Sequence, residues 1–323
     1  LLDYLHTAVR LGDGRTAVRN HCEVLDYVRS AGRVVAARTS ALGEIACRAV
    51  VDCSGVAAEP TAGLSMNLVV DRPGFCEGDR AMGLPHPDGR FVFVVPWRGR
   101  CMVGTWDRAY PHDPKPGLRF ESRWIDECLA WLAPAHPELA KLERESVHYV
   151  QAGLLPTEAE APELSRTDRV RVEPDGRVRV RGVKYTTARA VAARAVEQAA
   201  ELHGLPWEVG PPPRLFDRAE GLHEFSAERS DRGERLGGGA GPTLGEVLFG
   251  IDCEQARSLS DVLLRRTSTA SVGHPGRQVV DEVARFCARR LGWTDDELAT
   301  QVERFDSDFR FGVFAEARPS PPG

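Results

Sequence analysis

Hydrophobic side chains alternate with arginines over residues 178–181, and they recur every three or four positions over residues 188–202. The first period is typical of a strand and the second is typical of one face of a helix. Gly182 separates the two patterns, and Gly204 follows the second, where glycine commonly ends a helix. The pattern therefore predicts a strand, a glycine turn and a helix that begins close to Thr187.

The turn between these predicted elements suits a flavin ring. A helix N-terminus presents unpaired N–H groups and a partial positive charge. Both stabilise an anion, and a reduced flavin carries such a negative charge. Lys184 adds a cation, and Thr186 and Thr187 are placed to cap the helix. The segment indicates a flavin-binding turn, and a plain strand-turn-helix unit stays the alternative.

A helical pattern opens the chain, and three strand patterns follow it. Apolar side chains have helical spacing over residues 1–10, and strands are predicted at 17–27, 33–39 and 45–52. The last of these runs into Ser54-Gly55, a small-residue turn.

The pattern changes to that of an antiparallel sheet between residues 64 and 153. Apolar runs at 91–95 and 101–105 flank Arg98-Gly99, which is typical of a hairpin. A helix is predicted over 121–132. Three side chains on one face of that helix predict a core stripe: Trp124, Cys128 and Trp131.

Beyond the proline-rich joint at 211–213 the pattern becomes helical to the end. A helix is predicted between Pro275 and Gly292, and a second one follows a capping box of Thr294 and Glu297. The glycine cluster at 237–241 follows no strand. It therefore indicates a surface loop and not a phosphate-binding turn.

Four segments together resemble the family of FAD-dependent glycerol-3-phosphate dehydrogenases and oxidases. The segments are RAVVDCSG at 48–55, RFVFVVPWRGRCMVGTWD at 90–107, GVKYTTAR at 182–189 and SLSDVLLRRTS at 258–268. They occur in the same order as in the family. The resemblance implies an α/β (α+β) fold: the C-terminal part of a FAD/NAD(P)-binding Rossmann-like domain, an inserted antiparallel-sheet substrate domain and an all-helical C-terminal cap domain.

The resemblance also implies a division of the chain. The expected parts are the remainder of the FAD-binding domain at 1–60, the substrate domain at 61–160, a return to the FAD-binding domain at 161–210 and the helical domain at 211–323.

The implied reaction is oxidation of sn-glycerol 3-phosphate to dihydroxyacetone phosphate by hydride transfer to FAD. Lys184 and Arg166 are the catalytic candidates by resemblance. Contacts with FAD are expected at Cys22, Ser54, Gly55, Gly182, Lys184, Thr186 and Thr187.

A small-molecule substrate and quinone or oxygen as electron acceptor follow from the same resemblance. It indicates a cytoplasmic location and leaves peripheral association with the inner face of the membrane and a homodimer open.

Four positions depart from the family pattern. Leu155 stands where the family has an arginine, and Asn67 stands where it has a histidine. Leucine cannot make a charged contact with a phosphate, and asparagine cannot act as a general base near neutral pH. Leu64 replaces a lysine, and Trp106 replaces a small threonine and is expected to narrow the pocket.

These departures leave two alternatives to a glycerol-3-phosphate dehydrogenase. One is a flavin oxidase of a less anionic 2-hydroxy acid or amine, and the other is a non-catalytic relative that keeps the scaffold. The sequence also opens at Leu1 without the strand and G-x-G-x-x-G turn that hold the FAD pyrophosphate. A fragment that binds FAD poorly by itself is therefore expected.

The composition fits a globular enzyme. The net charge is −5, with 42 basic residues scattered among 47 acidic ones, so no basic stripe indicates a nucleic-acid partner. The eight cysteines stand apart, without a C-x-x-C pair or a neighbouring histidine pattern typical of a metal site. They are expected to be reduced, buried thiols.

Overall fold

The first part of the chain builds one helix and a small antiparallel sheet. The computed structural model describes residues 1–76, 78–115, 117–157, 167–182, 184–208 and 210–310. Helix α1 (Leu2–Gly12) precedes strands β1 (Val24–Ser30), β2 (Arg33–Thr39) and β3 (Gly43–Ala46), which pair in the order β1-β2-β3.

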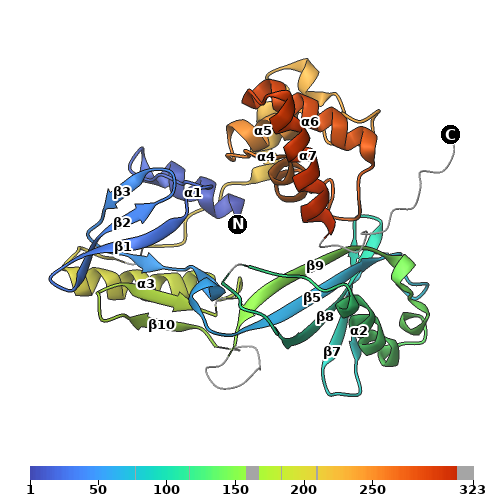
Figure 1. Ribbon diagram of the computed structural model, residues 1–323, viewed down its shortest axis with the longest axis horizontal. Helices are drawn as coiled ribbons and strands as arrows, with labels where there is room; N and C mark the ends of the chain where they lie inside the picture. The colour runs from blue at the N-terminus through green and yellow to red at the C-terminus, as the bar shows by residue number, and fades with distance from the viewer. Residues whose placement is uncertain (77, 116, 158–166, 183, 209, 311–323) are drawn as a thin grey trace.

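A second small sheet contains the only parallel strand pair of the described residues. Its order is β10 (Arg169–Val172), β11 (Val178–Arg181) and β4 (Val51–Asp52), with β11 parallel to β4. Helix α3 (Ala188–His203) follows β11 and packs on this sheet (Figure 1) through Val191, Ala195 and Ala199. Gly204 ends the helix in the left-handed conformation, as the sequence predicted.

The largest sheet is antiparallel and has five strands. Its order is β6 (Met82–Pro85), β7 (Phe91–Trp97), β8 (Arg100–Ala109), β5 (Ala62–Val70) and β9 (Val147–Pro156). Helix α2 (Arg123–Leu132) lies beside it (Figure 1), and short 3₁₀ turns flank this part: η1 (Gly55–Ala58), η2 (Ala133–Ala135), η3 (Leu139–Lys141) and η4 (Arg144–Ser146).

The C-terminal part is helical and lies against the β9 end of the large sheet (Figure 1). It contains α4 (Arg218–Ala227), η5 (Ser230–Gly233), α5 (Leu244–Asp252), the π-helical segment η6 (Asp261–Arg266), α6 (Arg277–Leu291) and α7 (Asp295–Arg310). Its core joins residues of α5, η6, α6 and α7. Thr294 and Glu297 form the predicted capping box through reciprocal backbone hydrogen bonds of 3.2 and 2.8 Å.

The N-terminal segment between α1 and β1 is tied to the helical part. The Asn20 side chain donates to the carbonyl of Gln255 at 2.6 Å, and His21 Nε2 lies 2.8 Å from an Asp261 oxygen. These contacts explain why the strand predicted at 17–27 was wrong in its first half. The chain runs toward the helical domain there, and β1 begins only at Val24.

The strand predicted at 45–52 is divided between two sheets. Residues up to Ala46 pair with β2, whereas Val51 and Asp52 pair with β11. The backbone between them donates from Cys47 to Val35 and accepts at Val50 from Val178. One short apolar segment therefore contributes strands to two sheets. The alternation of its apolar residues could not show this division.

The fold class predicted from the sequence is confirmed. Strand β4 precedes the large antiparallel sheet, its parallel partner β11 and the covering helix α3 follow that sheet, and the helical part ends the chain. The exact domain boundaries stay a prediction. No helix of the described residues combines the length and the apolar character that crossing a membrane requires.

The prediction that the cysteines are buried was wrong for half of them. Cys76, Cys101, Cys128 and Cys287 are buried, whereas Cys22 and Cys47 are half-buried and Cys53 and Cys253 are exposed. The exposed pair sits in turns just after β4 and α5.

Candidate functional site

Two turns predicted to contact a flavin lie at the same sheet edge. Parallel pairing aligns Val178 with Val51 and Arg179 with Asp52, so both strands point their carboxyl ends the same way. Ser54-Gly55 follows β4, and Gly182 follows β11. Ligands of open α/β sheets commonly bind outside the carboxyl ends of such strands.

Charged contacts hold these two turns together. Arg181 at the end of β11 forms an ion pair with Glu59, just after η1. Buried Asp52 accepts hydrogen bonds from the Ser54 N–H at 3.0 Å and from Arg177 at 3.1 Å. Burial acts to raise the pKa of Asp52, but the bonds from Ser54 and the charges of Arg179 and Arg177 outweigh it and lower this pKa. The Asp52 carboxylate therefore fixes the turn after β4.

The turn before α3 is open to solvent. Lys184, Thr186 and Thr187 are exposed, and Tyr185 is 73% exposed. Thr187 occupies the N-cap position, but its hydroxyl donates to the Lys184 carbonyl at 3.3 Å and makes no cap hydrogen bond. The predicted threonine cap was wrong in this respect, and the Ala188 N–H at the start of α3 donates to the Tyr185 carbonyl at 3.4 Å.

One predicted site residue lies elsewhere, and one lies outside the described residues. Cys22 is half-buried beside His21, in the segment that contacts the helical domain, and its proposed role toward FAD stays a prediction. Arg166 lies outside the described residues. The structure therefore groups Ser54, Gly55, Gly182, Lys184, Thr186 and Thr187 at one sheet edge.

A cleft of about 630 Å³ lies between strands β5 and β9 and the helical domain. Ser65 and Asn67 contribute to it from β5, and Gln151, Gly153 and Leu155 contribute from β9. Because side chains of a strand alternate between faces, Leu64, Met66 and Leu68 point the other way and are fully buried against the α2 side. One face of the sheet is a core, and the other is a candidate binding surface.

Two of the departures from the family pattern lie on the cleft. Leu155 is 41% exposed there, and Asn67 accepts a hydrogen bond from the Thr105 hydroxyl at 3.1 Å. A Cβ at Gly104 would come within 2.3 Å of the Asn67 amide oxygen, so glycine is required for this contact. Asn67 therefore presents a neutral amide to the cleft, and Thr105 and Gly104 fix its position.

The other two departures lie away from the cleft. Leu64 is fully buried, and Trp106 belongs to the same core on the α2 side. The expectation that Trp106 narrows the pocket was wrong. A β-bulge between Met66 and Asn67 pairs Trp106 with Met66, and it thereby places the indole on the core face.

The charged groups of the cleft come from the helical domain. Arg265 of η6 and Asp308 of α7 line it, together with Tyr149 of β9. Burial raises the pKa of Tyr149, with the Asp308 charge adding to this and the Arg265 charge opposing it. Sequence reasoning missed all three residues, although Arg265 stands within one of the segments that resemble the family.

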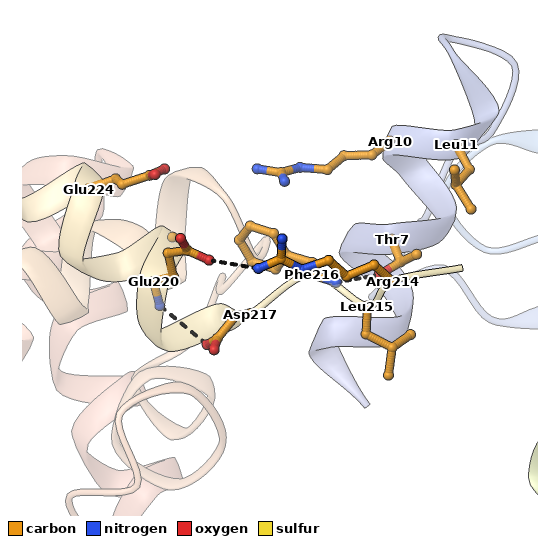
Figure 2. Close-up of a pocket in the computed structure, with 10 residues that line it drawn as sticks. Thr7, Arg10, Leu11, Arg214, Leu215, Phe216, Asp217, Glu220 and Glu224 are labelled. Carbon is orange, nitrogen blue, oxygen red and sulfur yellow. Dashed lines mark hydrogen bonds and ion pairs between the residues drawn. The ribbon is translucent and has the colours of Figure 1, made fainter. Parts of the chain in front are cut away.

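A second cavity, of about 360 Å³, lies at the joint between α1 and α4. Figure 2 shows Arg10 and Glu224 extending into it from opposite sides. Thr7 accepts a hydrogen bond from the Phe216 N–H at 2.8 Å, and the Arg10 guanidinium lies 4.2 Å from the Phe216 ring centre. These contacts join the N-terminal helix to the chain that enters the helical domain, so we interpret this cavity as part of a domain junction.

Family models match both the N-terminal part of the chain and its helical C-terminal part. Residues 3–198 match the model of the FAD dependent oxidoreductase family, and residues 217–298 match the C-terminal domain of alpha-glycerophosphate oxidase. The chain belongs to the FAD-dependent oxidoreductase family. The resemblance found in the sequence is therefore confirmed at the level of the family.

Curated relatives point the same way. The chain is 25% identical to the glycerol-3-phosphate dehydrogenase of Mycobacterium leprae (strain TN), over 98% of this chain and 63% of the relative. It is 26% identical to glycerol-3-phosphate dehydrogenase 2 of Mycobacterium tuberculosis (strain ATCC 25618 / H37Rv), over 94% and 61%. The chain thus spans about three fifths of the length of these relatives.

A solved structure has the same fold. The glycerol-3-phosphate dehydrogenase from Bacillus halodurans, solved in complex with FAD, superposes with a TM-score of 0.75 over 99% of this chain and 74% of that chain. At 20% identity this likeness shows the fold alone.

The paired turns fit the flavin part of FAD. Gly55 has a φ of +68°, and an added Cβ would meet no atom within 4 Å, so there is open space beside this backbone. The exposed Lys184 and the N–H groups at the start of α3 offer positive charge at the neighbouring turn. The donor set therefore suits an electron-accepting ring that becomes negative when reduced.

Proposed function

We propose that the full-length protein binds FAD non-covalently and oxidises an alcohol carbon of a small substrate. When bound, FAD supplies the acceptor for the hydride. The Ser54-Gly55 turn, Gly182, Lys184, Thr186 and Thr187 hold the flavin ring, and the cleft on β5 and β9 holds the substrate. The parallel pairing of β4 with β11 carries this proposal, because it brings both flavin-binding turns to one edge.

Lys184 supplies a cation at this edge. Its exposed ammonium group can stabilise negative charge on the flavin or on the substrate oxygen. Arg166 is proposed as a second contact with the anionic end of the substrate, by resemblance only.

The reference substrate is glycerol 3-phosphate, and we propose that it reacts slowly. The observation behind this is the mixed charge of the cleft, where Leu155 is apolar, Asn67 is neutral, and Arg265 is accompanied by Asp308. Losing one charge-assisted contact costs about 1.5 to 3 kcal/mol, which is roughly a tenfold to hundredfold rate loss. Replacing a histidine base with Asn67 would cost about a further 10².

The second candidate is a flavin oxidase of a less anionic 2-hydroxy acid or amine. The same cleft favours it, because Arg265 can pair with one carboxylate while Asp308 can pair with an amine. Oxygen would then accept the electrons, whereas a dehydrogenase would pass them to quinone.

Anaerobic stopped-flow bleaching of the flavin decides between these proposals. The full-length protein is mixed in turn with glycerol 3-phosphate, glycerol, a 2-hydroxy acid and a primary amine. We expect a yellow protein that glycerol 3-phosphate bleaches slowly. Fast bleaching by glycerol 3-phosphate would overturn the altered-substrate proposal, and a protein that binds FAD but is bleached by no tested donor would favour the scaffold alternative.

Lys184→Met tests the flavin edge directly. We expect flavin reduction to slow by about tenfold or more, because a charge-assisted contact is lost. Lys141→Met is the matched control, since Lys141 is an exposed lysine in η3. An unchanged reduction rate in Lys184→Met would place this lysine outside the reaction.

A further inference from the structure

Two buried cysteines lie in contact at one end of the large sheet. The Cys101 thiol donates to the Cys76 sulfur, and the two Sγ atoms are 3.1 Å apart. Cys101 belongs to β8 and pairs with Val70 of β5 and Pro96 of β7. Cys76 belongs to the segment after β5, and both side chains are at most 1% exposed.

The distance is short enough for a covalent bond. A disulfide needs an S–S distance of about 2.05 Å, so the sulfurs need to approach by about 1 Å, a change within the range of side-chain rotation. By contrast, Cys53 and Cys253 are exposed thiols in turns far apart in the chain. The geometry thus selects one pair of the described cysteines.

The surroundings of the pair decide when it can react. Burial raises the pKa of Cys101 to about 12, and the contact with Cys76 adds to this, whereas the Arg72 guanidinium opposes it. The Cys101 thiol is therefore protonated in the closed pair and slow to react, since the thiolate is the nucleophile. Gly74 and Gly78 on either side of Cys76 are exposed, so local opening of this segment gives an oxidant access to Cys76 first.

We propose that Cys76 and Cys101 are a modification site. A peroxide oxidises the pair, and a reversible disulfide forms between the two sulfurs. Hydrogen peroxide oxidises the Cys76 thiolate to a sulfenic acid, and its second oxygen leaves as water after protonation. The Cys101 thiol then gives up its proton as its sulfur attacks the Cys76 sulfur, the S–O bond breaks, and the oxygen takes a proton and leaves as water. In total two thiols lose two protons and two electrons, and one peroxide becomes two waters.

The bond would fix the segment after β5 to the sheet. Asp71 in this segment contacts Arg100 of β8 at 2.9 Å and His148 of β9 at 2.7 Å, and Phe75 lies 4.0 Å from the His136 ring. His148 in turn packs near Gly273 of the helical domain. The disulfide would therefore stiffen the sheet end at which the helical domain rests, whatever the substrate of the protein is.

The test is peptide mapping of the full-length protein after peroxide treatment. The folded protein is exposed to hydrogen peroxide, unfolded in an alkylating agent and digested without reductant. We expect a cross-linked peptide that contains Cys76 and Cys101 and separates on addition of dithiothreitol. The melting temperature should rise by roughly 5 °C on oxidation, because the cross-link joins residues 25 positions apart.

Two variants give the controls. Cys53→Ser keeps the cross-link, whereas Cys101→Ser removes both the cross-link and the rise in melting temperature. Cys76 should then accumulate as a sulfenic acid, which a dimedone-type probe detects. Full alkylation of Cys76 and Cys101 after treatment, while Cys53 and Cys253 are oxidised, would overturn the proposal.

Discussion

The two sheets that frame the proposed site are built in different ways. The large sheet presents a complete apolar face to α2, where Trp124, Ile125 and Leu132 are fully buried. The sheet of β4, β11 and β10 has only a small cluster of buried valines and alanines, and Val51 on β4 is 38% exposed. Charged groups around Asp52 and Arg181 connect its turns. The large sheet thus relies on packing, and the proposed flavin edge relies on polar contacts.

The proposed function accounts for this difference. A turn that receives a ligand has to leave its backbone groups uncovered, so it cannot bury much apolar surface. The cleft face of the large sheet avoids this conflict, because the opposite face of the same strands supplies the core. We therefore expect the two regions to differ in their response to mutation.

The largest effect is expected in the core of the large sheet. Trp124→Ala should lower the free energy of unfolding by about 3 to 5 kcal/mol, since a fully buried aromatic ring is lost. Trp124→Phe is the control. Its cost should be much smaller, because the Trp124 N–H makes no hydrogen bond within the described part of the chain. Urea unfolding monitored by near-UV circular dichroism measures both variants, and equal losses would contradict the packing argument.

A smaller effect is expected at the flavin edge. Asp52→Asn should cost about 2 kcal/mol, because it weakens charge-assisted bonds to Ser54 and Arg177. Asp79→Asn, at an exposed position, is the control. The same unfolding measurement applies, and a loss no larger than that of the control would show that the Asp52 contacts do not stabilise the turn.

The contribution of Asp52 also depends on pH. Its folded-state pKa lies below the ordinary value of 3.8, so the unfolded chain binds the proton more tightly. The stabilisation is therefore fully present above the unfolded pKa and is lost as the pH falls through the folded pKa. We expect the difference in stability between wild type and Asp52→Asn to shrink when the pH is lowered from 6 to 3. A constant difference would contradict the assignment.

The smallest effect is expected in the cluster below α3. Val191→Ala removes two methyl groups from a buried position and should cost about 1 to 2 kcal/mol. Hydrogen exchange is the suitable measurement, because the amides of β11 should exchange faster than before while those of β5 and β8 stay unchanged. Faster exchange in all three strands would show that the two sheets unfold as one unit.

Much of the fold was accessible from hydrophobic periodicity. The pattern predicted the strand of β11, the helix α3 with Gly204 at its end, the hairpin of β7 and β8, and the Thr294 capping box. These features depend on neighbours close in sequence, so local spacing carries them. The face of a strand also follows from its period, which is why Leu64 is on the core side once Asn67 is on the cleft side.

Other features depend on residues far apart in the chain. The sequence could not show that β4 would pair with β11 across more than a hundred positions, or that Arg265 and Asp308 would face Asn67 across the cleft. Nor did any spacing rule indicate the contact between Cys76 and Cys101, which β5 and β8 create by pairing.

The sequence by itself determined the types of elements, their order and the family to which the chain belongs. Local periodicity, turn residues and motif order are sufficient for these properties. The tertiary structure alone decided which turns share an edge, which charges enter the cleft and which thiols meet. Those outcomes follow from long-range strand pairing and from a bulge that places the Trp106 side chain in the core. Neither feature leaves a periodic pattern in the local sequence, so neither could be predicted from it.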